Sequence, residues 1–413
     1  MKPHKARHVR ALLVVGVSLP HHESLIARTF MHTPPHRSHG WNHDVVTPDW
    51  PALHVTEVHA LLDRFPALRG GVRIDWHSPR PFSAAARVHT NGSDVFVKRH
   101  HGRVRTPQAL REEHAFITHL NSHGLPVPTV LADADGHTAI ASGEWTYEVH
   151  TLATGLDVYR NTASWTPPFS LEHAHSAGQM LAQLHVAAAD FDAPMRSTTL
   201  LVAQDTLLRA PDLIAAIEAR CAARPALAEA LHMRDWRRQI SALLPRHARL
   251  QPQLLHQSRL WTHGDWHVSN LFWQPVRKPA QVSSILDFGL CAPTFALFDL
   301  ATAIERNAIA WLQLEQGMHA IYPDIALQLI AGYVKVLPLS PRQRSLLAEL
   351  LPLVHLDFAL SEVEYFHAIT RKSADVELAW SAFFLGHAAW FDSAPGLQLL
   401  DVIRAPALAP ALA

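Results

Sequence analysis

The segment WTHGDWHVSNLFW, residues 261–273, places an aspartate and an asparagine between two β-like runs. Asp265 and Asn270 lie five residues apart, a spacing that suits a tight loop. A carboxylate and a carboxamide that converge in such a loop can hold a substrate hydroxyl and Mg²⁺, which prefers oxygen ligands. Asp, Gly and Asn are also ordinary turn residues, so this segment alone leaves a purely structural turn equally open.

A second carboxylate follows this loop at the end of an apolar strand. In SSILDFG, Asp287 lies seventeen residues after Asn270, where a second cation ligand would belong. An ordinary strand-end aspartate is the alternative. Upstream, Lys98 in a predicted hairpin and Glu113 in a predicted helix complete a set whose order is typical of kinase-like phosphotransferases.

The elements that must position these side chains begin with a strand-rich lobe, which we predict over residues 54–149. The Asn-Gly pair at 91–92 is the strongest short signal for a β-hairpin, here between residues 86–90 and 94–99. Helical spacing follows over residues 110–120, and two or three further strands complete the lobe. The pattern predicts an antiparallel sheet with one helix.

The rest of the chain, residues 150–413, is predicted to be a mainly α-helical lobe, which makes the fold class α+β. Residues 171–188 and 205–250 show helical spacing. The strand material of this lobe is predicted at residues 254–265, 271–273 and 283–289.

Several segments together resemble the aminoglycoside phosphotransferase family, which also holds choline-kinase-like and homoserine-kinase-like enzymes. HGDWHVSN is similar to the family's HGDxxxxN loop, ILDFG to its metal-binding segment, FDLA to its downstream DLA, and EEHAFITHLNSHGLPVPTVL to its helix followed by GLPVP. The resemblance covers residues 54–390. It implies a bilobal protein-kinase-like fold that transfers the γ-phosphate of ATP, or of GTP, to a small-molecule hydroxyl with Mg²⁺.

The resemblance also implies roles for the matching residues of the loop. Asp265 is expected to be catalytic, because it would accept or orient the proton of the attacking hydroxyl. Asn270 and Asp287 are expected to bind Mg²⁺. Asp299 of the DLA segment would support the loop, and His263 would shape its backbone.

On the nucleotide side, Lys98 is expected to contact the phosphates and to pair with Glu113. The helical face supports this choice of carboxylate, because Glu113 shares a stripe with apolar residues that turn toward the sheet. The neighbouring Glu112 is expected to face solvent.

Two further nucleotide contacts follow from position in the chain. The loop expected to cover the phosphates, WHSPRPFSAA, contains no glycine, so a hydroxyl donor such as Ser83 would replace the close backbone approach that glycine permits. A plain strand-start serine is equally open. The adenine is expected at a hinge formed by Tyr147–Thr151, with contacts from Glu148 and His150.

Acidic residues of the family's C-terminal helices often receive cationic acceptors, and this chain offers candidates. Asp357 and Glu364 have helical offsets from one another, and Glu305 precedes Arg306 in an earlier helix. Solvated helix faces are the more common fate of such charges.

Composition narrows the function further. The chain has 413 residues, with 36 Lys+Arg against 36 Asp+Glu, so it lacks the basic excess that nucleic-acid partners require. Cys221 and Cys291 exclude a disulfide framework and favour a cytoplasmic location. No stretch is long and apolar enough to span a membrane, and the 31 histidines are expected to be mostly surface or core residues rather than metal ligands.

Residues 1–53 are predicted to be a flexible extension. Residues 1–30 are either upstream of a natural start at Met31 or a signal-peptide-like segment without a small-residue cleavage site. A protein kinase is disfavoured because DLA follows Asp287 by only twelve residues, which leaves no room for an activation loop. The alternative from another class is a nucleotide-binding sensor or scaffold of the same fold that has lost catalysis.

Overall fold

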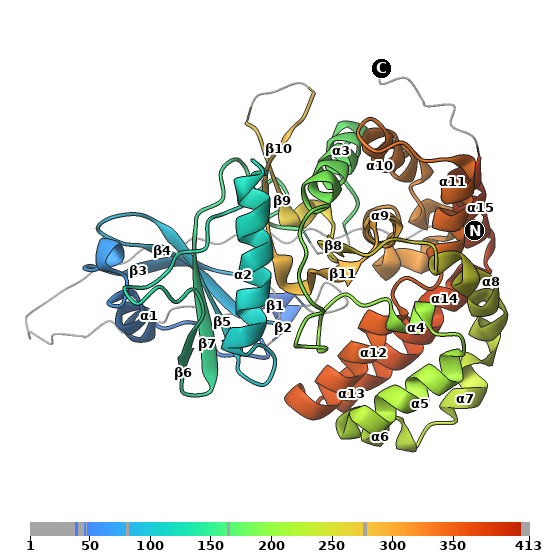
Figure 1. Cartoon of the computed structure of the whole chain (residues 1–413), viewed down its shortest axis with the longest axis horizontal. Coiled ribbons are helices and arrows are strands. Elements are labelled where there is room, and N and C mark those ends of the chain that lie inside the picture. The colour runs from blue at the N-terminus through green and yellow to red at the C-terminus, as the bar shows by residue number, and fades with distance from the viewer. Residues whose placement is uncertain are drawn as a thin grey trace, which may run out of the picture. The chain divides into compact units, whose positions relative to one another are not determined.

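A computed structural model of the protein describes residues 38–39, 45–46, 48–79, 82–162, 166–275 and 279–405. Within these ranges the predicted α+β fold class is confirmed, with one sheet-containing lobe and one mainly helical lobe (Figure 1). Most of the extension predicted over residues 1–53 lies outside the described residues.

The first lobe contains a five-stranded antiparallel sheet with the order β3-β4-β5-β7-β6. The hairpin around Asn91-Gly92 is confirmed, because residues 90–94 connect β4 to β5 and Val88 pairs with Val95. The helix predicted over 110–120 is present within α2, and a further helix, α1, precedes the sheet. The elements are α1 Val55–Leu62, β3 Arg73–His77, β4 Ala84–His89, β5 Val95–His101, α2 Pro107–Ser122, β6 Ile140–Ser142 and β7 Trp145–Thr151.

The two faces of this sheet differ in chemistry because side chains alternate along each strand. Val95 and Val97 of β5 and Val149 of β7 turn to one face, where they form an apolar core with α1. The residues between them, including Lys98 and Glu148, turn to the other face. Lys98 pairs directly with Glu148 in the ladder of β5 and β7, so the second face carries opposite charges side by side.

Helix α2 begins three residues before the range predicted from helical spacing, 110–120. Thr106 caps the first turn by accepting a hydrogen bond from the backbone N–H of Ala109 (3.2 Å), and Pro107 fills the first helical position, where a missing N–H costs nothing. The buried side of α2 includes Glu113, His114 and Phe116. The helix therefore brings polar as well as apolar side chains to the interior.

The second lobe is mainly helical (Figure 1). Its helices are α3 Leu171–Ala187, α4 Thr206–Arg209, α5 Leu213–Ala223, α6 Pro225–His232, α7 Trp236–Gln239, α8 Leu244–Leu254, α9 Ala296–Asn307, α10 Pro323–Val334, α11 Pro341–Leu350, α12 Leu356–Tyr365, α13 Ser373–Glu377, α14 His387–Trp390 and α15 Ala394–Arg404. None of the helices in the described ranges has the length and hydropathy needed to cross a membrane.

Two short antiparallel strand pairs carry the loops of interest: β8 Leu260–Thr262 with β11 Ala292–Thr294, and β9 Leu271–Trp273 with β10 Val282–Ile285. The strand predicted over residues 254–265 was too long, because Leu254 is the buried last residue of α8. The start of this apolar run belongs to the end of α8, and only its last part, Leu260–Thr262, forms the strand β8.

Packed structure begins before residue 54. Asp49 accepts a hydrogen bond from the Tyr365 hydroxyl (3.3 Å) and pairs with Lys372 of the second lobe. The ring of Trp50 stacks on His101 of β5, with ring centres 5.1 Å apart. The last residues of the predicted extension are thus part of the folded protein.

Candidate active site

The loop between β8 and β9 turns sharply at Gly264. This residue has φ +77°, in the left-handed region that favours glycine. A Cβ atom at this position would lie 2.7 Å from the backbone oxygen of Leu290, so the segment after Asp287 packs directly on the turn. The glycine of HGD is therefore required both by backbone conformation and by close approach.

Asp299 holds this turn from the first part of α9. Its carboxylate accepts hydrogen bonds from the backbone N–H groups of His263 (2.8 Å) and Gly264 (2.9 Å), and the Nε2 atom of His185 lies 3.1 Å away. His263 in turn contacts the backbone oxygen of Leu286 through Nε2 (2.8 Å). Asp299 and His263 thus have the positions from which they would support the loop.

The Asp265 carboxylate lies in a strongly polar environment. Arg306 approaches Oδ1 to 3.0 Å, Asn270 donates to Oδ2 through Nδ2 (3.2 Å), and His267 lies 3.6 Å from Oδ2. Burial alone would raise the pKa of Asp265, but Arg306 and the nearby histidines outweigh it and hold the pKa well below its usual range. Asp265 is an ionised carboxylate at neutral pH.

Asn307 is a loop support that the sequence analysis missed. Its Oδ1 accepts from the backbone N–H of Val268 (3.0 Å), and its Nδ2 donates to the backbone oxygen of Trp266 (2.9 Å). The signal was available in the spacing, because Asn307 lies eight residues after Asp299, an offset that places both residues on one side of α9. The whole inner face of α9 therefore holds the loop.

Asp287 and Lys98 meet across the two lobes. The Nζ atom of Lys98 donates to Oδ1 of Asp287 (3.0 Å) and lies 3.8 Å from Oε1 of Glu148. Burial would lower the pKa of Lys98, but these two carboxylates outweigh it and raise the pKa, so Lys98 stays charged. Asp287 itself has φ +58°, a strained conformation for a non-glycine residue that recurs at functional sites.

The expected pair between Lys98 and Glu113 is not formed. Glu113 is buried as predicted, but its Oε2 atom lies 3.7 Å from Nη2 of Arg196. Glu112 is also not simply solvated, since it accepts a hydrogen bond from the backbone N–H of Ser197 (2.9 Å). The strand neighbour Glu148 takes the place beside Lys98, because the β5–β7 register sets the two directly opposite one another.

A cavity of about 670 Å³ lies against these residues. It is lined by charged and amide groups of both lobes and by aromatic rings, including Lys98, Glu113, Asn270, Asp287, Trp76 and Phe96. Ser83 is part of its wall, although residues 80–81 of the predicted phosphate loop lie outside the described residues. The cavity is large enough and polar enough on one side for a nucleotide.

The hinge expected at Tyr147–Thr151 is instead the strand β7. Its backbone pairs with β5 and β6, and the backbone oxygen of Val149 also accepts from the N–H of Leu131 (2.8 Å). The cavity wall continues along the chain into Leu152 and Ala153. Backbone contacts to a base would therefore come from residues after β7.

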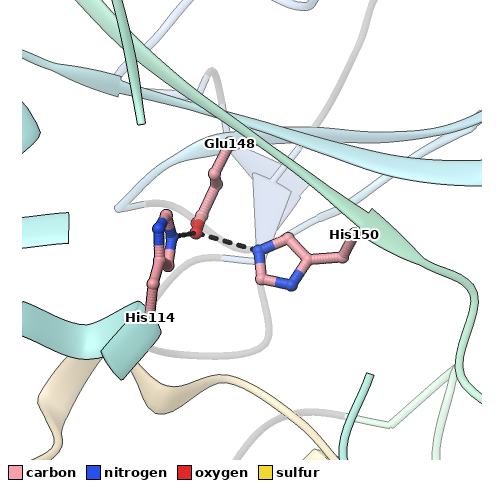
Figure 2. Close-up of side chains that lie close together, drawn as sticks. All are labelled: His114, Glu148 and His150. Carbon is pink, nitrogen blue, oxygen red and sulfur yellow. Dashed lines mark hydrogen bonds and ion pairs between the residues drawn. The ribbon is translucent and has the colours of Figure 1, made fainter. Parts of the chain in front are cut away.

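Glu148 has partners that the sequence analysis did not expect. Oε1 lies 3.0 Å from Nε2 of His100, while Oε2 lies 2.8 Å from Nε2 of His114 and 2.9 Å from Nε2 of His150 (Figure 2). Burial would raise the pKa of Glu148, but these histidines lower it well below its usual value. Its carboxylate and the His150 ring thus bind one another within the sheet lobe, and both residues also line the large cavity where we expected the nucleotide.

The three acidic residues proposed for an acceptor pocket are not brought together. Asp357 pairs with Arg220 and accepts from the backbone N–H of Leu207 (3.0 Å), and Glu364 lies 2.5 Å from Arg224. Both carboxylates therefore tie α12 to α4 and to the α5 region. The helical offsets were right, but the face that they define packs against other helices.

Glu305, in contrast, lies close to the loop that carries Asp265. It is buried, with Nδ1 of His387 3.1 Å from its Oε1, and it lines a small cavity of about 20 Å³ together with Gly264 and Arg306. Burial raises the pKa of Glu305. This residue keeps its place as a candidate for acceptor recognition.

Glu362 is a second acidic residue near the loop, and the sequence analysis missed it. It is 2% exposed, and no hydrogen-bond partner for its Oε2 atom is found among the described residues. Burial raises its pKa to about 8, partly opposed by Arg306 and assisted by Asp265 and Glu305. Glu362 lies in α12 outside the helical stripe of Asp357 and Glu364 from which acceptor residues were expected.

Glu362→Gln is expected to stabilise the protein at high pH. Between pH 5 and 8 the unfolded chain releases the Glu362 proton while the folded protein keeps it, so wild-type stability falls by up to about 1.4 kcal/mol per pH unit from this group. The variant lacks this loss of stability. Below pH 4.5 the pH dependence of the free energy of unfolding should become the same for the two proteins. Urea unfolding from pH 4 to 9 measures the difference, with the exposed Glu315→Gln as control; parallel curves for wild type and Glu362→Gln would contradict the prediction.

Comparisons with known proteins agree with this arrangement. The model of the "Phosphotransferase enzyme family" matches residues 81–333. A homoserine kinase from Xanthobacter autotrophicus (strain ATCC BAA-1158 / Py2) is 29% identical over 247 residues, which span 60% of this chain and 66% of the length of that relative.

Two solved structures share the fold. A microcompartment-associated aminopropanol kinase has a TM-score of 0.54 and 16% identity, over 84% of this chain and all of that one. The amicoumacin kinase hAmiN in complex with AMP-PNP, Ca²⁺ and Ami has a TM-score of 0.52 and 13% identity, over 85% and 93% of the two chains. The protein-kinase-like fold implied by the sequence motifs is thereby confirmed.

Proposed function

The chain belongs to the phosphotransferase enzyme family, and we propose that it transfers the γ-phosphate of ATP to a hydroxyl group of a small molecule. The observation that carries the proposal is the meeting of Lys98, Asn270 and Asp287 on one cavity, with Asp265 bound directly to Asn270. These four groups come from both lobes and from three separate segments.

The donor half of the proposed site suits a Mg-nucleotide. Asn270 uses Nδ2 to bind Asp265, which leaves Oδ1 as the amide's candidate cation ligand, and Asp287 offers a carboxylate that is 42% exposed toward the cavity side of Lys98. Oxygen ligands of this kind, few in number, are what Mg²⁺ takes beside phosphates. When bound, Mg²⁺ would neutralise charge on the transferring phosphate.

Asp265 would act on the acceptor. As the acceptor oxygen bonds to the γ-phosphorus and the bond to the bridging oxygen of ATP breaks, ADP leaves and the hydroxyl proton passes to the Asp265 carboxylate. A carboxylate with so low a pKa is a weak base, so its main task is to hold and orient the hydroxyl. Arg306, Asn270 and Asn307 keep it in place.

We further propose that the acceptor carries an amino or ammonium group, as aminoglycosides, choline and homoserine all do. Glu305 and Glu362 are buried close enough to Arg306 and Asp265 for these charges to influence their pKa values, and burial raises both pKa values. A cation bound near them would relieve the cost of keeping carboxylates in an apolar interior. The names of the homoserine kinase and aminopropanol kinase relatives point to the same acceptor class.

The test is ATP and GTP consumption by the full chain with Mg²⁺ and a panel of hydroxylated amines: homoserine, aminopropanol, choline and an aminoglycoside. Each has a matched control, such as 2-aminobutyrate for homoserine, that lacks the reacting hydroxyl. We expect turnover of at least one panel member and none of its control. Thermal stabilisation by Mg-ATP without turnover of any acceptor would instead favour the nucleotide-binding sensor.

Lys98→Met is expected to weaken nucleotide binding. A charge-assisted hydrogen bond to phosphate is lost, so the KM for ATP should rise about tenfold or more. Exposed Lys335→Met at the end of α10 serves as the matched control and should leave KM unchanged. Equal KM values for all three proteins would show that Lys98 does not bind the phosphates.

A further inference from the structure

The polar face of the N-terminal sheet carries more ligand chemistry than the proposed phosphotransfer uses. Glu148 and His150 are two residues apart on β7, so their side chains leave the same face. His114 reaches this face from α2, which packs against it. The three side chains converge from two elements, and His114 and Glu148 are 34 residues apart in the chain (Figure 2).

The atoms that converge are of the types that a transition metal binds. Nε2 of His114, a carboxylate oxygen of Glu148 and a nitrogen of His150 all lie within 4.8 Å of one another. Both imidazoles aim Nε2 at the same atom, Oε2 of Glu148, at 2.8 and 2.9 Å. We propose that His114, Glu148 and His150 form a binding site for a divalent first-row transition ion such as Zn²⁺.

The geometry needs little change to accept the ion. With bonds of about 2.0–2.1 Å in a tetrahedral site, neighbouring ligand atoms lie about 3.3 Å apart, so the two contacts of Glu148 with His114 and His150 open by a few tenths of an ångström. Two imidazoles and one carboxylate select Zn²⁺ or its neighbours over Mg²⁺, which prefers oxygen ligands. Three protein ligands leave a fourth position for water, and Glu148 and His150 line the large cavity, which supplies a route in.

The surroundings are those of a metal site with an outer shell. Nδ1 of His114 lies 2.9 Å from the hydroxyl of Thr138, an orienting contact of the kind that metal-bound histidines make. The other carboxylate oxygen, Oε1, faces His100 (3.0 Å) and Lys98 (3.8 Å). The ion would thus occupy one side of Glu148 and leave Lys98 on the other.

A second histidine cluster must be removed before the site is tested. His119, His123 and Asp190 also lie within ligand distance of each other, but His123 and Asp190 are exposed and His119 already contacts the backbone oxygen of Ala187 (2.8 Å). His123→Ala eliminates this surface cluster. It supplies the parent protein in which the buried site is measured.

The experiment titrates Zn²⁺ into metal-free, full-length His123→Ala protein by calorimetry, without nucleotide, and records the visible spectrum with Co²⁺. We expect that His150→Gln, at a side chain 12% exposed, weakens one binding event at least about tenfold and removes the corresponding Co²⁺ absorption. Thr138→Val should weaken it about tenfold through loss of the outer contact. His100→Gln, which touches the same carboxylate through the other oxygen, is the matched control and should keep the site.

Unchanged Zn²⁺ stoichiometry and affinity in His150→Gln would overturn the proposal, and so would an equal loss in His100→Gln. Either result would mean that the histidines only donate hydrogen bonds to a buried carboxylate. Unfolding curves without metal identify any variant that fails to fold. Because no nucleotide or acceptor is present, the result is independent of the phosphotransferase proposal.

Discussion

Asp265→Asn is expected to lower kcat by about 10²–10⁴-fold, because the acceptor hydroxyl loses the carboxylate that orients it and takes its proton. Nucleotide binding should be nearly unchanged, since the residues proposed to bind the phosphate side, Lys98 and Asp287, pair with one another and are not altered. The asparagine keeps the shape of the side chain and one oxygen for Arg306. Steady-state kinetics with the best acceptor of the panel, together with the KM for ATP, measure both halves of the expectation.

The matched control is Asp205→Asn, at a buried aspartate that also pairs with arginines, Arg209 and Arg259, outside the residues that line the large cavity. Both variants remove a buried negative charge that pairs with an arginine, so both should have a lower free energy of unfolding. Only Asp265→Asn should lose kcat. A similar kcat in the two variants would remove Asp265 from the catalytic role.

Asp299→Ala is expected to damage both stability and activity. Two buried backbone N–H groups, of His263 and Gly264, would lose their acceptor, and each unsatisfied group costs about 1–3 kcal/mol. The free energy of unfolding should therefore fall by about 2–6 kcal/mol. Because the same bonds set the turn before Asp265, kcat should fall even under conditions where the variant remains folded.

Urea unfolding provides the comparison, with Asp212→Ala as control. Asp212 caps α5 through one hydrogen bond to the backbone N–H of Ala215 (3.0 Å), a contact worth about 1 kcal/mol at an exposed helix end. If Asp299→Ala unfolded at the same urea concentration as Asp212→Ala, the buried carboxylate would not be the anchor of the loop. If a folded Asp299→Ala protein kept its kcat, the hydrogen bonds of Asp299 would be needed for stability but not for catalysis.

The local elements could be predicted because the residues that define each of them lie within a short segment of the chain. The hairpin around Asn91-Gly92 is confirmed between β4 and β5, with a connection over residues 90–94 that is longer than a two-residue turn, and the helix expected over 110–120 is present within α2. The HGD turn needs glycine for its own backbone. Capping, turn conformation and periodicity act over a few residues, so they can be recognised without knowing what the segment packs against.

Charged partners were harder to predict, because the competition among them takes place between distant segments. Glu113 was correctly expected to be buried, but Arg196 binds it, and Glu148 stands beside Lys98 through strand register. Asp357 and Glu364 lie on one helical face as expected, yet arginines from the α5 region occupy that face. Sequence spacing defines which face of its helix a residue lies on. It does not define which residues of other elements pack against that face.

By itself the sequence determined the protein's fold class, the family resemblance and the order of the loop residues from His263 to Asp299, because local spacing and turn chemistry encode them. Only the tertiary structure decided that α9 supplies Arg306 and Asn307 to the loop, that Glu362 lies near Asp265, and that three histidines surround Glu148. The physical reason is that a buried carboxylate takes whichever cation or N–H donor the packing of distant elements brings within reach.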